Sequence, residues 1–516
     1  MHPWSRRHFL GAAAAAAAAP RVFAQDRPPN ILFVSIDDLN DWAGLLGGHP
    51  QGSTPNLDAL AARGISFTNA HTAAPLCNPS RAAVLTGVAP WRSGVYNNHQ
   101  DWRTALPRIR SLPARLKDEG WFTYGVGKIF HIGDPDAWSE AFPDACSRPA
   151  DAPGAEPLRI ERPTGRIMWG ATRTDTDDVL SDARVAEAAA AFLARPPREP
   201  FFLGCGFFKP HLPWFLPETR LSALDLDSIV LPEVRADDLA DVPPAGRALA
   251  RPQVHERLRA SGQWAAAVRA YLACLQFMDA QLGRVLRALE ASPAAARTVV
   301  VVWSDHGWSL GEKSHWKKSA LWEECTRVPL VFAGPGVPAG VQHASPASLL
   351  DIRPTLLGLA GLPVADEIDG QDLRPAFTDP AWGAGRGVLT AHHHGNLAVR
   401  TARHRLIRYA DGSEELYDHA KDPQEWQNLA GDAGSAAVRD TLRAMLPATI
   451  ARPAPISDPP CGGVNRGGHD DDDDDDHDDG NGDRIPPPRG GGRRANDNDN
   501  NPRNDNDLNP GGRRGR

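Results

Sequence analysis

The 516-residue chain lacks three patterns, and each absence excludes a class of protein. Its six cysteines include no C-x-x-C pair and no regular framework, so the sequence predicts no disulfides. No basic surface interleaved with aromatic residues stands out, so we expect no nucleic-acid partner. Beyond the N-terminal segment, no apolar run is long enough for a stable membrane span. The formal net charge of −8 and the apolar content of 41% are ordinary for a globular protein of this length.

The first 24 residues carry an export pattern. Arg6 and Arg7 precede an alanine-rich run, which ends in the small-residue cleavage pattern Val22-Phe23-Ala24. The apolar stretch is too short to cross a bilayer comfortably, which favours a cleaved twin-arginine (Tat) signal peptide over a membrane helix. We therefore expect the Tat export machinery as a partner and a periplasmic or secreted location.

Short apolar strands alternate with helical patterns between residues 29 and 362. Helices are expected from Pro55 to Arg63, from Ser111 to Gly120 and on the apolar face of 271–289. The candidate strands are 31–36, 122–126, 201–205 and 298–303. Strands of this apolar kind are typical of a mostly parallel sheet covered by helices on both faces. The predicted fold class is therefore α/β, with the main domain at residues 25–380.

The pattern changes after about residue 388. Two short strands, 397–401 and 405–409, flank a turn, and a helix is expected over 435–451. These elements predict a smaller α+β subdomain at residues 381–455. Residues 456–516 are mainly Gly, Pro, Asn, Asp and Arg, with an unbroken aspartate run from 470 to 476. Such a segment buries too little apolar surface to fold, so we predict a disordered low-complexity tail.

Charged and imidazole side chains follow four of the predicted strands. In chain order they are Asp37 and Asp38, Lys128 and His131, Lys209 and His211, and Asp305 and His306. In an open α/β sheet, ligands bind beyond the carboxyl ends of the strands. One such pair is often only a solvated turn or a helix cap, but four pairs together predict a shared site.

The side chains at these ends suit a hard divalent cation. Asp37, Asp38 and Asp305 offer carboxylate oxygens, and His306 could add a nitrogen ligand or orient a neighbour. Such a set favours Ca²⁺ or Mg²⁺, whereas zinc would be expected to use more imidazole or thiolate.

Basic side chains around the same edge suit an oxyanion such as sulfate or phosphate. They are Arg81, Lys128 and either Lys317 or Lys318. His131 and His211 can donate or accept protons near neutral pH. Cys77 lies where residues 79–85 begin a helix whose free amides favour an anion, although a lone cysteine is more often a buried apolar residue.

The motif around that cysteine resembles the sulfatases. Cys77-x-Pro79-Ser80-Arg81-x-x-x-Leu85-Thr86-Gly87 is similar to the full sulfatase motif in its cysteine form. Segments 54–60, 304–307 and 415–429 are similar to sulfatase segments in the same order. From about residue 29 to 453 the chain is identified as a member of this family, within the alkaline-phosphatase-like superfamily. Segments 127–131 and 209–213, and histidine at position 306, are most similar to the iduronate-2-sulfatase branch.

The resemblance implies that Cys77 is oxidised after synthesis to formylglycine, an aldehyde whose hydrate carries two hydroxyls. One hydroxyl would attack sulfur and expel the alcohol, and loss of a proton from the other would release sulfate. Arg81 would hold this group and a metal carboxylate. The implied cofactor is Ca²⁺, with Mg²⁺ possible, and its ligands are the modified Cys77, Asp37, Asp38, Asp305 and His306. The implied partners are a sulfated sugar substrate and a formylglycine-generating maturation enzyme.

The resemblance also implies roles for the surrounding residues. The catalytic set is Cys77, Arg81, Lys128, His131, His211 and Lys318, and the substrate-binding set is Lys128, Lys209, His211 and Lys318. His131 would take a proton from the sulfated hydrate, and His211 would protonate the leaving alcohol. Alignment on Trp316 favours Lys318 over the adjacent Lys317 as the sulfate-binding lysine.

Two alternatives stay open on the sequence alone. The first is a phosphoester or phosphonate-ester hydrolase on the same scaffold, because formylglycine sites can act on both kinds of ester. A zinc phosphatase would instead need a Ser or Thr nucleophile and further His and Asp ligands. The second is a non-catalytic binder of sulfated glycans, which requires Cys77 to remain a thiol. The complete set of catalytic groups argues against this second alternative.

Overall fold

The computed structural model describes residues 27–142, 151, 153–164, 167–364 and 368–457. The predicted signal peptide and the predicted tail after residue 457 lie outside the described residues. Within these ranges, no helix combines the length and the apolarity that a membrane crossing requires.

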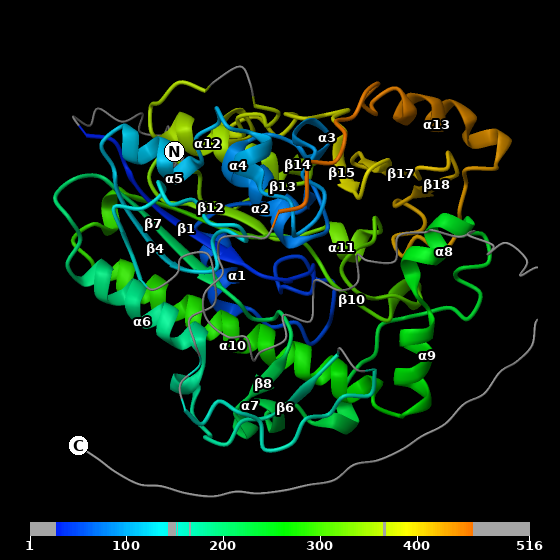
Figure 1. Cartoon of the computed structure of the whole chain (residues 1–516), viewed down its shortest axis with the longest axis horizontal. Helices are drawn as coiled ribbons and strands as arrows, with labels where there is room; N and C mark the ends of the chain where they lie inside the picture. Colours follow the sequence, from blue (N-terminus) through cyan, green and yellow to red (C-terminus); the bar gives the residue numbers. More distant parts are fainter. Residues whose placement is uncertain (1–26, 143–150, 152, 165–166, 365–367, 458–516) are drawn as a thin grey trace, which may run out of the picture. The chain divides into compact units, whose positions relative to one another are not determined.

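The central element is an eight-stranded, mostly parallel sheet (Figure 1). Its strands in spatial order are β13 (Val341–His343), β2 (Gly64–Phe67), β12 (Leu330–Ala333), β9 (Thr298–Ser304), β1 (Asn30–Ile36), β7 (Phe201–Phe207), β4 (Phe122–Gly127) and β5 (Glu140–Ala141). Strand β12 runs antiparallel to both of its neighbours, whereas β9, β1, β7 and β4 run parallel to one another. Every residue of β1, β7 and β9 is buried, which accounts for their continuous apolar runs.

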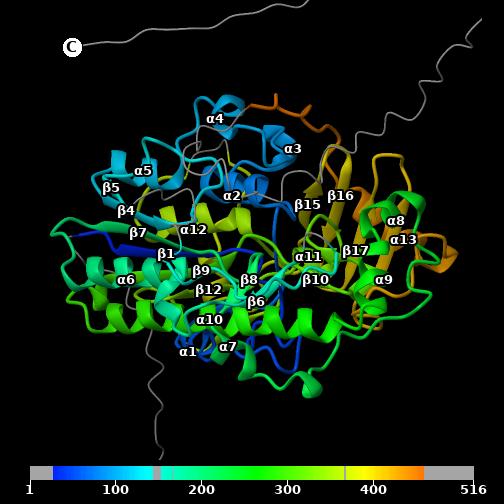
Figure 2. The same ribbon diagram turned by 60° about the horizontal axis from the view of Figure 1, so that its bottom comes forward.

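Helices cover both faces of this sheet (Figure 2). One face carries α1 (Pro55–Ala62), α6 (Ser181–Ala194) and the long α10 (Trp264–Glu290), and the other carries α2 (Cys77–Thr86), α5 (Leu112–Asp118) and α12 (Ile352–Leu359). Each layer encloses its own apolar cluster. The fold is therefore the α/β sandwich that the strand–helix alternation predicts.

Two predicted helix boundaries differ from the structure. Helix α2 begins at Cys77, two residues before the expected start, so the cysteine is part of the first helical turn. Helix α13 spans only Ala436–Arg443, not 435–451. Proline at position 447 lacks an amide hydrogen and disfavours helical geometry in the residue before it, so the helix ends earlier than its apolar pattern suggests.

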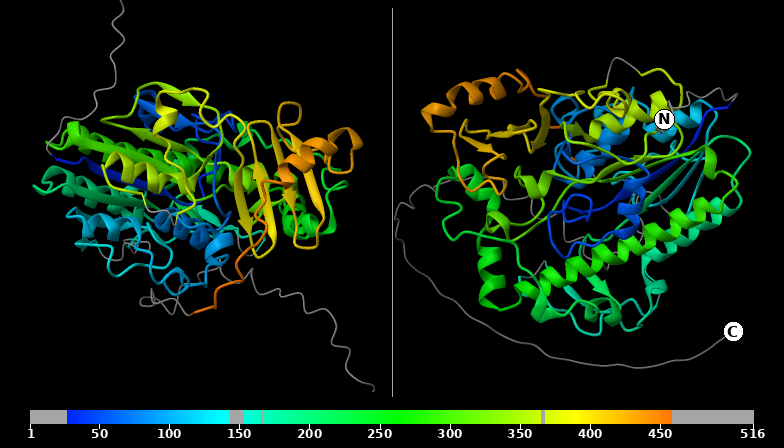
Figure 3. Two further views of the ribbon diagram at one scale, coloured as in Figure 1. Left: turned by 90° about the horizontal axis from the view of Figure 1, so that it is seen from above. Right: turned by 180° about the vertical axis from the view of Figure 1, so that it is seen from behind.

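A smaller antiparallel sheet follows in the chain. Its strands are β15 (Val388–His392), β16 (Asn396–Arg400), β17 (His404–Arg408) and β18 (Glu414–Asp418), paired in that order. Figure 3 shows α13, in orange, beside these yellow strands. Strands β16 and β17 form the hairpin that the sequence predicts, and together with α13 they make up the α+β subdomain.

Buried ion pairs join this subdomain to the short helix α11 (Glu323–Thr326). Glu323 pairs with Arg400, 3.1 Å from its Nε, and with Arg405. Arg405 also pairs with Glu425. All four side chains are at most 10% exposed. Burial alone would raise the pKa of Glu323, but the arginines and His419 hold that pKa well below its usual range.

Residues 451–457, called the C-terminal strap below, lie against the loop that follows α2. The amide of Ala451 donates to the carbonyl of Trp91 at 2.7 Å, and Gln100 Nε2 donates to the carbonyl of Ala454 at 2.6 Å. The carbonyl of Gln100 in turn accepts from Asn78 Nδ2 at 2.9 Å. The strap is therefore connected by hydrogen bonds to the residue next to Cys77.

Replacing Glu323 by glutamine should strongly destabilise the protein, because two buried arginines lose the charge of a shared partner. We expect the free energy of unfolding to fall by about 3–5 kcal/mol, as measured by urea denaturation. Glu290→Gln is the matched control, since it removes an exposed partner of Arg63 and should cost about 1 kcal/mol or less. Equal losses in the two variants would contradict a structural role for the buried pairs.

Candidate active site

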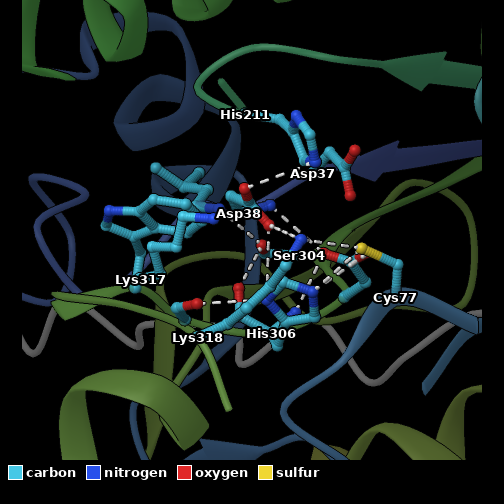
Figure 4. A network of polar contacts seen from close by, with 12 residues as sticks. Asp37, Asp38, Cys77, His211, Ser304, His306, Lys317 and Lys318 are labelled. Carbon is cyan, nitrogen blue, oxygen red and sulfur yellow. Dashed lines mark hydrogen bonds and ion pairs between the residues drawn. The ribbon is translucent and has the colours of Figure 1, made fainter. Parts of the chain in front are cut away.

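Strand ends and one helix deliver side chains to a single buried site, and Figure 4 shows Asp37, Asp38, Cys77, His211 and His306 in this group. Strands β9, β1, β7 and β4 are neighbours, so their carboxyl ends share one edge of the sheet. This edge carries Asp37, Asp38, Lys128, His211, Asp305 and His306, and Cys77 enters from the first turn of α2. The structure therefore brings together six of the eight residues that the strand ends predicted as one site, without His131 and Lys209.

Cys77 lies in a positively charged environment. Its Sγ is 3.1 Å from Lys318 Nζ and 3.3 Å from His306 Nε2, and its side chain is buried. Burial alone would raise the pKa of Cys77, but Lys128 and Lys318 outweigh this effect and hold it well below the usual value. A negatively charged group is thus strongly favoured at this position.

Arg81 ties the strand ends together from inside the fold. Its Nε lies 2.8 Å from Asp305 Oδ2, and its Nη2 lies 3.1 Å from Asp37 Oδ1. Its Nη1 donates to the carbonyls of Lys128, at 2.6 Å, and Ile129, at 3.2 Å. Since Arg81 is fully buried, these partners offset the cost of removing its charge from water.

The pKa values of two carboxyl groups at this edge, those of Asp37 and Asp305, shift in opposite directions. Lys128 Nζ lies 2.5 Å from Asp37 Oδ2. Although burial raises the pKa of Asp37, Lys128 and Arg81 hold it well below its usual range. Burial raises the pKa of Asp305 to about 7, with Arg81 and His306 opposing the rise. A divalent cation beside Asp305 would favour its ionised form.

Asp38 adopts a left-handed backbone conformation, with φ of 61°, which is unfavourable for a residue with a side chain. Its carbonyl accepts a hydrogen bond from the Tyr271 hydroxyl at 2.8 Å, and its amide donates to Asp305 Oδ1 at 3.2 Å. The next amide, of Leu39, donates to Ser304 Oγ at 3.0 Å. These contacts hold the strained turn and so fix the direction of the Asp38 carboxylate.

Tyr271 is a functional residue that the sequence analysis placed only in the apolar face of a helix. That placement is correct, since Tyr271 is fully buried in α10. Its hydroxyl nevertheless reaches the turn that contains Asp38, where it also accepts a hydrogen bond from the amide of Asn40 at 3.0 Å. Helical periodicity identifies the buried face but carries no signal for the polar end of one ring.

The acidic side chains at this edge fit a divalent cation. Ligand atoms of Asp37, Cys77, Asp305 and His306 all lie within 4.8 Å of one another, and those of Asp38, Cys77 and His211 form an overlapping group. Within the described part of the chain, Asp38 Oδ2 is buried with no hydrogen-bond partner. A cation would satisfy this oxygen, and the predominance of carboxylates suits Ca²⁺ or Mg²⁺.

The remaining predicted residues differ in how directly they reach the centre. Lys318 Nζ lies 3.3 Å from Asp38 Oδ1, and His211 Nε2 lies 3.8 Å from Asp38 Oδ2. Lys209 is buried and donates from Nζ to the carbonyl of Pro213. His131 is partly buried, and among the described residues it makes no hydrogen bond or ion pair with Cys77.

Two family models match the chain. The sulfatase model matches residues 29–362, and the model of the C-terminal part of N-sulphoglucosamine sulphohydrolase matches residues 311–452. The first spans more than half of the chain and contains all of the residues of the candidate site. The second spans the small antiparallel sheet and α13.

Similar proteins of known name lie in the same family. A sulfatase of Formosa agariphila is 36% identical over 452 residues, covering 82% of this chain and 87% of the relative. The Δ4,5-hexuronate-2-O-sulfatase of Bacteroides thetaiotaomicron is 30% identical, covering 86% and 92%. Human iduronate 2-sulfatase is 30% identical, covering 65% and 69%.

A solved structure supports the same fold. The phosphonate monoester hydrolase of Agrobacterium radiobacter has a TM-score of 0.65 at 24% identity, covering 81% of this chain and 95% of that one. The described sheet, its helical layers and the small C-terminal sheet thus form the alkaline-phosphatase-like fold. The chain belongs to the sulfatase family, has iduronate 2-sulfatase among its relatives, and is a sulfuric ester hydrolase.

Proposed function

We propose that this enzyme removes sulfate from a sulfated carbohydrate, in the manner of a uronate 2-O-sulfatase, through a formylglycine formed from Cys77 and a bound divalent cation. The observation that carries the proposal is the position of Cys77, between Lys318 and His306 at the edge that bears the buried acids. The names of two relatives, a hexuronate-2-O-sulfatase and an iduronate 2-sulfatase, support a uronate as the sugar.

The proposed cation is Ca²⁺, with Mg²⁺ as the alternative. Asp37, Asp38, Asp305 and His306 would hold it together with the modified Cys77. When bound, it would supply positive charge that polarises the sulfate ester and favours an ionised nucleophile. Arg81 forms ion pairs with both Asp37 and Asp305 and so holds these two carboxylates in place.

A formylglycine hydrate at position 77 would supply the hydroxyl that attacks sulfur and the second hydroxyl through which sulfate leaves. Lys318 Nζ lies 3.1 Å from Cys77 Sγ, Lys128 pairs with the neighbouring Asp37, and both lysines would bind sulfate oxygens. Both lysines are at most 8% exposed, so their charges act in a space from which water is largely excluded. The build-up of negative charge on the sulfate oxygens is thereby stabilised.

We assign to His211 the role of protonating the leaving alcohol. Its Nδ1 lies 2.5 Å from the carbonyl of Leu212, which requires a hydrogen on that nitrogen. The ring therefore turns Nε2 toward the site, where it lies 3.8 Å from Asp38 Oδ2. We assign to His131 the role of accepting the proton from the second hydroxyl, and to Lys209 a contact with the substrate outside the sulfate pocket.

Export and maturation complete the proposal. The twin-arginine pattern at residues 6 and 7 supports Tat export to the periplasm or the medium. The cysteine form of the motif supports a formylglycine-generating enzyme as a partner during synthesis. Phosphoester or phosphonate-ester hydrolysis is the second candidate activity, since a phosphonate monoester hydrolase shares the fold.

Mass spectrometry of the protein from its native host should find an aldehyde at position 77 in the tryptic peptide that spans residues 64–81. Cys77→Ala should lose at least about a thousandfold in kcat/KM on sulfate esters, because the nucleophile is removed. The same two samples should be assayed on phosphate and phosphonate esters. An unmodified thiol in a protein that binds sulfated glycans without hydrolysing them would overturn the proposal in favour of a binding protein.

Tyr271→Phe should weaken divalent-cation binding by about tenfold to a hundredfold, because the turn that directs Asp38 loses a hydrogen bond. Isothermal titration of the chelator-treated protein with Ca²⁺ measures this change directly. Tyr409→Phe is the matched control, since that buried hydroxyl bonds to Glu415 in the small sheet. Identical Ca²⁺ affinities in the two variants would show that Tyr271 does not support the cation site.

A further inference from the structure

The segment that carries His211 leaves the central sheet at the end of β7. Residues 208–213, called the His211 loop below, follow β7 directly and precede β8 (Trp214–Leu216). The two prolines of this loop have no backbone amide. Its first two amides, those of Phe208 and Lys209, lie beyond the strand pairing of β7 with β1 and β4, so they need partners from elsewhere in the fold.

Asp182, in the first turn of α6, supplies both partners. Its Oδ1 accepts from the amide of Phe208 and its Oδ2 accepts from the amide of Lys209, each at 2.8 Å. The Asp182 side chain is 1% exposed. Burial raises its pKa to about 6, while the two amides and the charge of Lys209 oppose the rise. At neutral pH the group is therefore ionised, which is the form in which both oxygens accept.

The remainder of the His211 loop is held by its own hydrogen bonds. The amide of His211 donates to the carbonyl of Phe208 at 2.9 Å. Nε1 of Trp214, a fully buried residue, donates to the carbonyl of Pro210 at 2.6 Å. The backbone that Asp182 binds is thus directly connected to the residue from which the imidazole projects.

The ring of Phe208 extends this constraint to two side chains of the proposed mechanism. Its centroid lies 4.5 Å from that of the His211 ring, with 50° between the ring planes. Lys128 Nζ lies 5.1 Å from the same centroid, within the range of a cation–π contact. Because the amide of Phe208 is bound to Asp182, the position of the ring between His211 and Lys128 depends on that carboxylate.

We infer that Asp182 is a positioning residue that acts through Phe208 and holds His211 where its imidazole can protonate the leaving alcohol. The carboxylate binds backbone amides of the loop, so it acts on the reaction through the loop and not by contact with the substrate. A displacement of about 1 Å at an acid catalyst is enough to slow a reaction strongly. This inference rests on the proposed function, since it assumes the role assigned to His211.

The dependence of the rate on the leaving group tests the inference. Asp182→Asn keeps the shape of the side chain but replaces one acceptor oxygen with a group that donates. It should lower kcat/KM by about tenfold to a hundredfold on methyl glucuronide 2-sulfate, whose alcohol must be protonated as it leaves. On 4-nitrophenyl sulfate, whose leaving group is a weak base, the loss should be about threefold or less. Equal losses on the two substrates would contradict the inference.

Asp279→Asn is the matched control. Asp279 lies in α10, is 1% exposed and accepts from the amides of Asn56, at 3.0 Å, and Leu57, at 2.9 Å. The same substitution there disturbs an equivalent pair of contacts at the start of α1, so it should destabilise the fold in a comparable way. The ratio of the two rates should stay as in the native enzyme. An equal change of this ratio in both variants would overturn the inference, because the ratio would then report general destabilisation.

A double-mutant cycle asks whether Asp182 acts through His211. In a His211→Ala background, the effect of Asp182→Asn on kcat/KM should shrink to about twofold or less, because the group that Asp182 positions is absent. Phe208→Leu removes the ring and keeps an apolar side chain, so it should show the same dependence on the leaving group. It provides the same test if Asp182→Asn does not fold. Full additivity of Asp182→Asn and His211→Ala would count against the inference.

Hydrogen exchange separates failure of the positioning from failure of the proposed function. In Asp182→Asn, peptides that contain residues 208–211 should exchange at least about tenfold faster than in the native protein. Asp279→Asn should instead speed exchange at residues 56–57. This result would support the positioning even if the native enzyme hydrolyses neither substrate. Unchanged exchange in the His211 loop, alongside normal hydrolysis of sulfate esters by the native enzyme, would reject the positioning and leave the proposed function intact.

Discussion

One buried guanidinium holds the catalytic edge of the sheet together. Arg81 projects from α2 and contacts Asp37, Asp305 and the backbone that follows β4, so one side chain ties together the ends of three strands. A buried arginine without partners would be very unfavourable, and each carboxylate without the arginine would be unfavourable in turn. The orientation of Asp37 and Asp305, two of the proposed cation ligands, is therefore a consequence of how the protein folds.

The pairing of buried basic and acidic side chains also determines the charge of the site around Cys77. Two lysines and an arginine lie among three aspartates, all of them at most 8% exposed. The pKa directions differ from one carboxyl group to the next. That of Asp37 is held low, while that of Asp305 rises to about 7. A site of this kind can accept a cation and an oxyanion together, because each compensates charges that the other leaves unbalanced.

Much of this architecture could be predicted from the sequence, and the rest depends on distant contacts. The apolar strands and the polar residues that follow them are local features, which is why the sheet and its edge were foreseeable. The hydroxyl of Tyr271 meets Asp38 across 233 positions, and Glu323 meets Arg405 across 82, and no local pattern encodes either pair. Of the two consecutive lysines, Lys318 contacts Cys77, as the alignment on Trp316 favoured.

The C-terminal strap has a consequence for the timing of events during synthesis. The carbonyl of Ala451 accepts a hydrogen bond from the hydroxyl of Tyr96, 355 positions earlier in the chain, so the loop beside Cys77 is completed by residues that are synthesised much later. In the finished protein Cys77 is 1% exposed. The proposed maturation enzyme would therefore have to reach this cysteine before the strap closes on that loop.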